Sequence, residues 1–374
     1  MFVPESSGIA LALCVLNMLC WAFWPTLREK CVVPMPAFAF LNMTSQLLTS
    51  IVFAATLGSS GVGTDDAAWQ FLARALSGHD ARVFAVFAGG FLLGHSDHMG
   101  SLAMQVIPAG VAYPLYAGIT TVFGTCFDAA QVGLGSDPVL VLLGLALVLV
   151  GLALLALGQD VGTRRRSQHG EDGILSLQPS GNSASACDRN LTSPEGSPRD
   201  ALCESSAAQH KQRISARCAM LICALAGLAG GGWSPLSTLG RAASMEENPV
   251  RCAYVSALVF AFGQLCAYPS VALLGKGLGG ISLHDAFRTL TVRRALFGCL
   301  CGVSVNTGYV LYFVASSLIS PTITFCLVSC NPLLALGISS LRGQFREAPR
   351  IQLLLFACCA VSYGTAIALL AVAK

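Results

Sequence analysis

The residues best suited to chemistry are His95, Asp97 and His98, near the middle of the apolar run from Val83 to Val106. An ionised carboxylate at that depth in a membrane costs at least ~2.5 kcal/mol, so Asp97 should face a cavity or a partner. Successive helical residues are about 100° apart, so one cavity could contact both Asp97 and His98. Because burial favours the neutral acid, we predict that Asp97 and His95 take up and release protons. The alternative is that these residues line a water-filled vestibule or a kink.

Three further side chains could contact a polar substrate. Asn306 lies inside another apolar run, where it could bind a substrate or hold two helices together with about 0.6 kcal/mol. Trp24 and Trp233 lie beside prolines, and their rings could stack on a flat heterocycle. A place in the aromatic belt at the membrane surface is the alternative for Trp24. The predicted substrate site consists of Asp97, His98, Asn306, Trp233 and Trp24.

Long apolar helices are needed to position these residues. Hydrophobic residues make up 54% of the 374, and charged residues only 11%, where a soluble domain has about 25% charged. The apolar runs approach the roughly 20 residues that cross a bilayer, and a helix satisfies its own backbone in lipid. We therefore predict an all-α polytopic membrane protein of about ten transmembrane helices. The runs are Gly8–Trp24, Ala37–Leu57, Val83–Val106, Gly110–Phe127, Val139–Gly158, Ala216–Leu239, Cys252–Leu274, Ala295–Ser317, Ile319–Leu341 and Ile351–Val372.

The third and eighth runs share one spacing of small and polar residues. GFLLGHSDHMG begins at Gly90 and GCLCGVSVNTG begins at Gly298, so three glycines and a serine recur at equal intervals. Asn306 then occupies the place of His98. Since five is an odd number, a second five-helix copy enters the membrane in the opposite sense. Inverted repeats of this kind are typical of secondary transporters, which bind substrate near the midplane. We predict repeats over 1–158 and 216–374.

The segment 159–215 joins these repeats. It is rich in Ser, Gly, Pro and charge and has too little apolar content to fold alone, so we predict a disordered linker. Most of the 22 Lys and Arg residues lie in this segment and in the loops on the same side. The positive-inside rule then places the linker in the cytosol and both termini outside.

Several function classes lack their sequence signature. There is no Walker A motif, no G-x-S-x-G, no H-E-x-x-H, and no C-x-x-C among the 16 cysteines. We therefore expect no enzyme, no cofactor and no metal site. The expected partners are a small-molecule substrate, protons and the lipid bilayer, with no nucleic acid, and a homodimer is left open. The plasma membrane is the expected location, with an internal membrane as the alternative.

Several blocks resemble the plant ureide permeases of the drug/metabolite transporter superfamily. These are MFVPESSGIALALC, WPT, GITTVFGTCFDAA and GYVLYFVASSLISPTITFCLVSCNPLLALGISSLRGQFRE. The resemblance implies proton-driven import of allantoin, uracil and similar oxo-heterocycles. Its family-like positions are Glu5, Trp24, Pro25, Gly118, Thr120, Thr121, Gly124 and Thr125. The HSDH stretch is not a feature of that family, so Asp97 takes no role from it.

The predicted function is secondary transport of a small polar metabolite, ureide-like or nucleobase-like, by symport with protons. One alternative is a sugar or nucleotide-sugar transporter of the same superfamily. Nucleotide sugars would need Lys or Arg within the spans to meet phosphate, and the predicted runs contain essentially none. The other alternative is a non-transporting membrane scaffold or receptor whose linker recruits partners. Deleting 170–206 separates these, since a transporter should still move substrate.

Overall fold

The computed structural model describes an all-α chain. It covers residues 7–31, 33–59, 81–106, 109–134, 137–168, 216–241, 249–277, 283–288, 290–343 and 348–373, with a few isolated positions between them, and these contain no strand. The helices are α1 (Ser7–Lys30), α2 (Met35–Ala55), α4 (Ala81–Val106), α5 (Ala109–Val132), α6 (Pro138–Gln168), α8 (Ala216–Gly231), α9 (Trp233–Arg241), α10 (Pro249–Gly277), α11 (Leu283–Arg288), α12 (Val292–Ala315), α13 (Pro321–Val328), α14 (Asn331–Leu341) and α15 (Arg350–Val372).

Eight helical stretches within the described residues are long and apolar enough to cross a membrane. Their outward faces carry exposed side chains such as Leu142 and Leu143 on α6 and Leu353 and Leu354 on α15. Large apolar side chains cover a surface in this way when lipid surrounds it. The chain is therefore a multi-pass integral membrane protein. Helices α4 and α5 stand at the third and fourth expected positions but are not among the eight, so the count of ten stays a prediction.

Two expected runs are each divided into two helices. The run from Ala216 contains α8 and α9, which meet at Gly232, and the run from Ile319 contains α13 and α14, which meet at residues 329–330. Several other helices are longer than expected, among them α5, which passes Phe127 and ends at Val132. Helix α1 passes Trp24 and ends at Lys30, and α6 passes Gly158 and ends at Gln168. The first residues of the expected linker are thus helical, and the rest of it lies outside the described residues.

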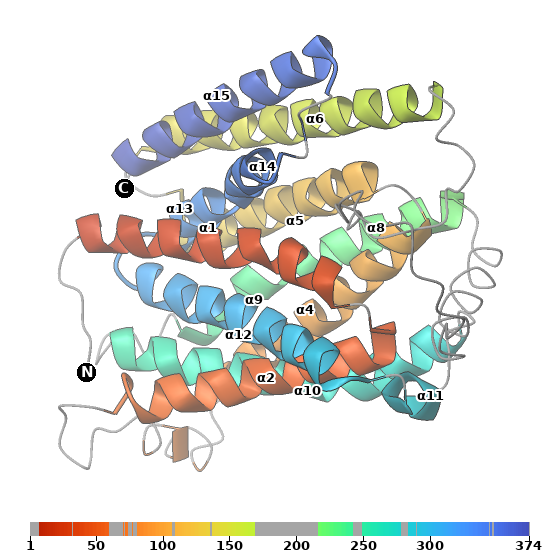
Figure 1. The fold of residues 1–374 in the computed structure, drawn as a ribbon. Helices are drawn as coiled ribbons and strands as arrows, with labels where there is room; N and C mark the ends of the chain where they lie inside the picture. Colours follow the sequence, from red (N-terminus) through yellow and green to blue (C-terminus); the bar gives the residue numbers. More distant parts are fainter. Residues whose placement is uncertain are drawn as a thin grey trace.

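The helices pack in a bundle with two distinct edges (Figure 1). Helices α6 and α15 lie side by side at one edge, and α2 and α10 pack together at the other. Between them, α4 packs on α8, α9 and α10, while α12 packs on α1 and α2. Helix α5 contacts α8 on one side and α13 on another. Segments from the two ends of the chain are thus interleaved throughout the bundle.

The α6–α15 pair has a regular antiparallel interface. Gly144, Gly151 and Gly158 recur every seventh residue on α6, and a Cβ at each would contact Leu370, Tyr363 and Phe356 of α15 respectively. Small residues that face large ones let two helix backbones approach closely. Ser362 also donates a hydrogen bond to the Leu147 carbonyl, at 2.7 Å. The register of this pair is therefore set at every second turn.

Candidate functional site

Asp97 lies inside α4, where it meets α5 and α8. Its side chain is partly buried, and its Oδ1 accepts a hydrogen bond from the Tyr116 hydroxyl of α5 at 3.0 Å. The buried Ser96 hydroxyl lies 3.1 Å from the same phenol oxygen and 2.7 Å from the Ala226 carbonyl of α8. A carboxylate, a phenol and a serine hydroxyl from neighbouring helices thus form one connected group. We call these residues the Asp97 cluster.

Gly230 of α8 makes room for this cluster. A Cβ at Gly230 would lie 2.6 Å from Ser96 Oγ, 3.0 Å from Thr120 Oγ1 and 3.3 Å from Tyr116 Oη. Three hydroxyls from α4 and α5 therefore converge on one glycine, and only a residue without a side chain fits there. Thr120 also donates to the Gly227 carbonyl of α8, at 3.1 Å. The hydroxyls give the Asp97 carboxyl a polar surrounding inside an apolar bundle.

The two histidines beside Asp97 have different environments. Nδ1 of His95 lies 2.9 Å from the Phe91 carbonyl, and Nε2 lies 2.6 Å from the Ser270 hydroxyl of α10. Nδ1 of His98 lies 2.6 Å from the Gly94 carbonyl, which can only accept, so this nitrogen carries the hydrogen. Nε2 of the neutral His98 ring is then an acceptor, and it is buried without a partner among the described residues. The structure brings neither imidazole into a hydrogen bond with the Asp97 carboxyl.

Asn306 is fully buried in α12. Its Oδ1 accepts a hydrogen bond from the Ser50 hydroxyl of α2 at 3.0 Å. Its Nδ2 donors have no partner among the described residues. An unsatisfied buried polar group costs about 1–3 kcal/mol. Asn306 therefore joins two helices and still has a donor that a ligand could use.

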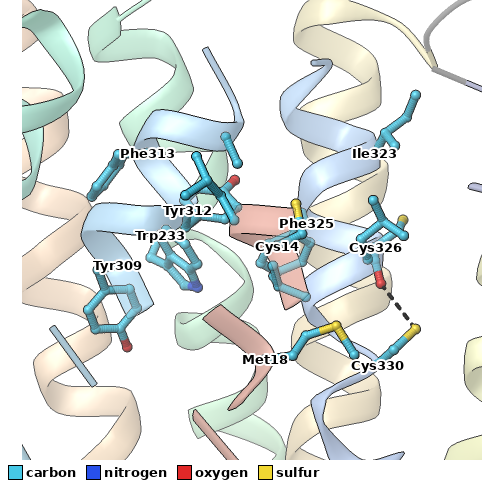
Figure 2. Packing of buried hydrophobic residues seen from close by; sticks show 14 of the residues in the cluster. Cys14, Met18, Trp233, Tyr309, Tyr312, Phe313, Ile323, Phe325, Cys326 and Cys330 are labelled. Carbon is cyan, nitrogen blue, oxygen red and sulfur yellow. Dashed lines mark hydrogen bonds between the residues drawn. The ribbon is translucent and has the colours of Figure 1, made fainter. Parts of the chain in front are cut away.

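Trp233 lies in an aromatic core and not at a surface (Figure 2). Its side chain is 2% exposed, and its ring centroid lies 4.8 Å from Tyr312, 5.6 Å from Tyr309 and 5.7 Å from Phe325. A substrate could stack on this ring only after neighbouring rings moved. Trp24 is partly buried and packs between two hydrophobic clusters. The stacking roles of both tryptophans stay predictions.

Tyr309 connects the aromatic core with the Asp97 cluster. It lies within electrostatic range of Asp97 and Tyr116, and the Gln264 side chain of α10 lies beside its phenol. Trp21 and Trp233 pack edge-on against its ring, at 5.3 and 5.6 Å between centroids. Neither Tyr309 nor Tyr116 follows from the sequence pattern, because aromatic residues are common in membrane helices. Their role depends on contacts between helices far apart in the chain.

The family-like residues of α5 face other helices. Thr121 and Thr125 are buried, and Thr125 Oγ1 lies 3.3 Å from the Cys326 sulfur of α13. A Cβ at Gly124 would meet the Phe325 ring and the Gly231 carbonyl. These positions hold α5 against α8 and α13, while Glu5 lies outside the described residues. No group of three His, Cys, Asp or Glu close enough to hold a metal ion occurs in the described part of the chain.

Comparisons with known proteins bear on the fold alone. No family model matches the chain, and no protein of curated function matches its sequence. Fifteen solved chains match the fold. One of them, described only as "Crystal structure of protein", is 16% identical with a TM-score of 0.55, over 97% of this chain and 98% of that chain. The fold is thus shared with a solved protein over nearly the whole length, and the resemblance to the ureide permeases stays a prediction.

Proposed function

We propose that this chain is a secondary active transporter that couples a small polar metabolite to protons through Asp97. The observation that carries the proposal is the Asp97 cluster. A carboxyl inside a helix of a membrane bundle is partly exposed, is bonded to Tyr116, and lies within electrostatic range of Tyr309. Ionisable side chains at such positions mark ion or proton pathways in membrane proteins.

The packing of the bundle supports two inverted five-helix repeats. Exchange of the first five expected runs with the last five maps the α4–α10 contact onto α12–α2, and the α4–α8 contact onto α12–α1. The α6–α15 and α2–α10 contacts map onto themselves. Such a set of contacts is what a two-fold axis between α6 and α15 and between α2 and α10 would produce. Inverted repeats alternate access by rocking around a site at their interface.

The proposed substrate is a neutral oxo-heterocycle such as allantoin or uracil. Buried unpartnered groups on equivalent helices support this class. His98 on α4 offers an acceptor and Asn306 on α12 offers a donor. The edge of a ureide or nucleobase carries both N–H and C=O groups and could satisfy both. The resemblance to the ureide permeases points to the same compounds.

Uptake of labelled allantoin and uracil into proteoliposomes under an imposed pH gradient tests this function. The wild type should accumulate substrate only with the gradient, and Asp97→Asn should lose that stimulation. Asp285→Asn is the matched control, because this carboxyl on α11 has a side chain 60% exposed. Uptake without any pH dependence would contradict proton coupling, and absence of uptake of both compounds would contradict the ureide assignment.

One observation favours the second candidate, a sugar or nucleotide-sugar transporter. Arg28 belongs to the last turn of α1 and is partly buried. Its guanidinium carbon lies 4.1 Å from the Phe38 ring centroid, and its Nη1 donates to the Cys31 carbonyl at 2.7 Å. A cation in this place could meet a phosphate. A labelled nucleotide sugar in the same uptake assay, with Arg28→Gln, decides between the two candidates.

A further inference from the structure

A second carboxyl is buried in the bundle, away from the Asp97 cluster. Asp128 is fully buried near the C-terminal end of α5. It lies twelve residues after Tyr116 on the same helix, which is about 18 Å at 1.5 Å per residue. Asp97 and Asp128 are therefore at different depths and cannot share one site. The expected fourth run ended at Phe127, so the sequence pattern gave Asp128 no role.

Asp128 belongs to a chain of hydrogen bonds that includes two hydroxyl groups. The Ser234 hydroxyl of α9 donates to Asp128 Oδ2 at 2.5 Å, and Ser234 Oγ lies 2.6 Å from the Tyr312 hydroxyl of α12. A serine hydroxyl has a single hydrogen, so Tyr312 must donate to Ser234 while Ser234 donates to Asp128. Both hydrogens thus point toward the carboxyl. A protonated Asp128 can donate to Ser234, and the Ser234 and Tyr312 hydroxyls can then reverse the direction of their hydrogen bonds.

Two opposing effects act on the charge of this carboxyl. Ser234 lies in the first turn of α9, whose N-terminal end carries a positive partial charge that favours a carboxylate. Burial in an apolar bundle favours the neutral acid, and so does the negative C-terminal end of α5 itself. Movement of α9 away from Asp128 would remove both the Ser234 bond and the positive helix end. Proton binding and the α5–α9 contact therefore oppose each other.

Several titratable groups of the described residues lie near Asp128 or on the helices that pack against α5. Tyr312 on α12 and the Cys326 thiol on α13 face it, and Cys126 lies on α5 with its side chain exposed. From the other helices that pack on α5, the Cys223 thiol of α8 donates to the Ala112 carbonyl near the opposite end of α5. Asp137 accepts from the backbone N–H groups that begin α6. None of these is a histidine or an amine.

We propose that Asp128 is a second proton-binding site, at the contact of α5 with α9 and α12, and that loss of its proton closes this contact. The inference rests on the proposed transport function. Helix α5 belongs to the first repeat, and α9 and α12 belong to the second. A proton that opens or closes a contact between the repeats is linked to alternating access, because the site binds it more tightly in one arrangement than in the other.

The first experiment uses Asp128→Asn, which keeps the shape of the protonated acid. In proteoliposomes this variant should still exchange labelled uracil for unlabelled uracil without a gradient, and it should lose accumulation driven by a pH gradient. Asp285→Asn should keep both. Accumulation like that of the wild type in Asp128→Asn would overturn the proposal. Loss of exchange together with accumulation in a folded variant would also overturn it, because Asp128 would then serve only to position helices.

The second experiment needs neither a variant nor a substrate. Dicyclohexylcarbodiimide reacts with protonated carboxyls in apolar surroundings, and peptide mass spectrometry locates the adduct. On the purified wild-type protein, labelling of Asp128 should increase as the pH falls, and Asp285 should stay unlabelled. No adduct at Asp128 at any pH would overturn the proton site. If labelling occurs while no compound is transported, the transport function is wrong and the proton site stands.

Discussion

Helices α4 and α12 pack alike but differ in chemistry. Gly94 of α4 lies against the Gln264 carbonyl and Ala267 of α10, and Gly302 of α12 lies against the Asn42 carbonyl and Ser45 of α2. Two residues further on, Ser96 donates to the Ala226 carbonyl of α8 and Ser304 donates to the Cys20 carbonyl of α1, each at 2.7 Å. On both helices, therefore, the glycine packs against one neighbouring helix and the serine hydrogen-bonds to another.

Helices α4 and α12 differ at the residue that follows this serine. Asp97 of α4 corresponds in spacing to Val305 of α12, which is 7% exposed and belongs to the main hydrophobic core. His98 likewise corresponds to Asn306. The shared residues make helix contacts, whereas the candidate site uses the positions that differ. Two helices can therefore share one mode of packing while only one of them carries a carboxyl at the next position.

Substitution at Val305 and at Asp97, each by the residue of the other helix, should have the largest effect on stability. Val305→Asp would bury a carboxyl in an apolar core, and we expect a loss of about 2.5 kcal/mol or more. Asp97→Val should cost far less stability, because it removes a carboxyl and leaves only the Tyr116 hydroxyl without its acceptor. Thermal unfolding in detergent measures both. Val305→Thr, nearly equal in shape and uncharged, is the control. Equal losses of stability for Val305→Asp and Asp97→Val would contradict this difference between α4 and α12.

Substitution of the shared glycines should have the next largest effect. A Cβ at Gly302 would overlap Ser45 Oγ and the Asn42 carbonyl, and one at Gly94 would lie 2.9 Å from Ala267 Cβ. We expect Gly302→Ala and Gly94→Ala each to cost about 1–3 kcal/mol, because the helices must separate. Gly364 of α15 has nothing within 4 Å of its Cβ position, so Gly364→Ala should be neutral or slightly stabilising. A melting temperature for Gly302→Ala equal to that of Gly364→Ala would contradict the close packing.

The shared serines should have the smallest effect. Ser96→Ala and Ser304→Ala each remove one hydrogen bond to a backbone carbonyl, for a loss of about 1 kcal/mol. Because Ser96 also contacts Tyr116, we expect Ser96→Ala to reduce gradient-driven uptake, whereas Ser304→Ala should change stability alone. The two variants are compared in the unfolding and uptake assays. Equal uptake in both would show that the Ser96–Tyr116 contact has no part in transport.

The sequence could predict the helices and the candidate carboxyl, because apolar length and a charge inside an apolar run are local features. The spacing from Gly94 to Ser96 and from Gly302 to Ser304 was also visible. The sixth run was predicted as one helix, although Gly230, Gly231 and Gly232 stand at the break and Pro235 follows it. Tyr116, Ser234 and Tyr312 could not be assigned, because their bonds join residues 19, 106 and 78 positions apart.

The α6–α15 pair has one fixed register, so it can serve as a reference for distances within the molecule. Three glycines of α6 each receive one large side chain of α15, so a shift of one residue would place Leu370, Tyr363 and Phe356 against backbone that carries side chains. Sliding between these helices is blocked in steps shorter than seven residues. Distances measured from this pair can therefore report the motion of the remaining helices.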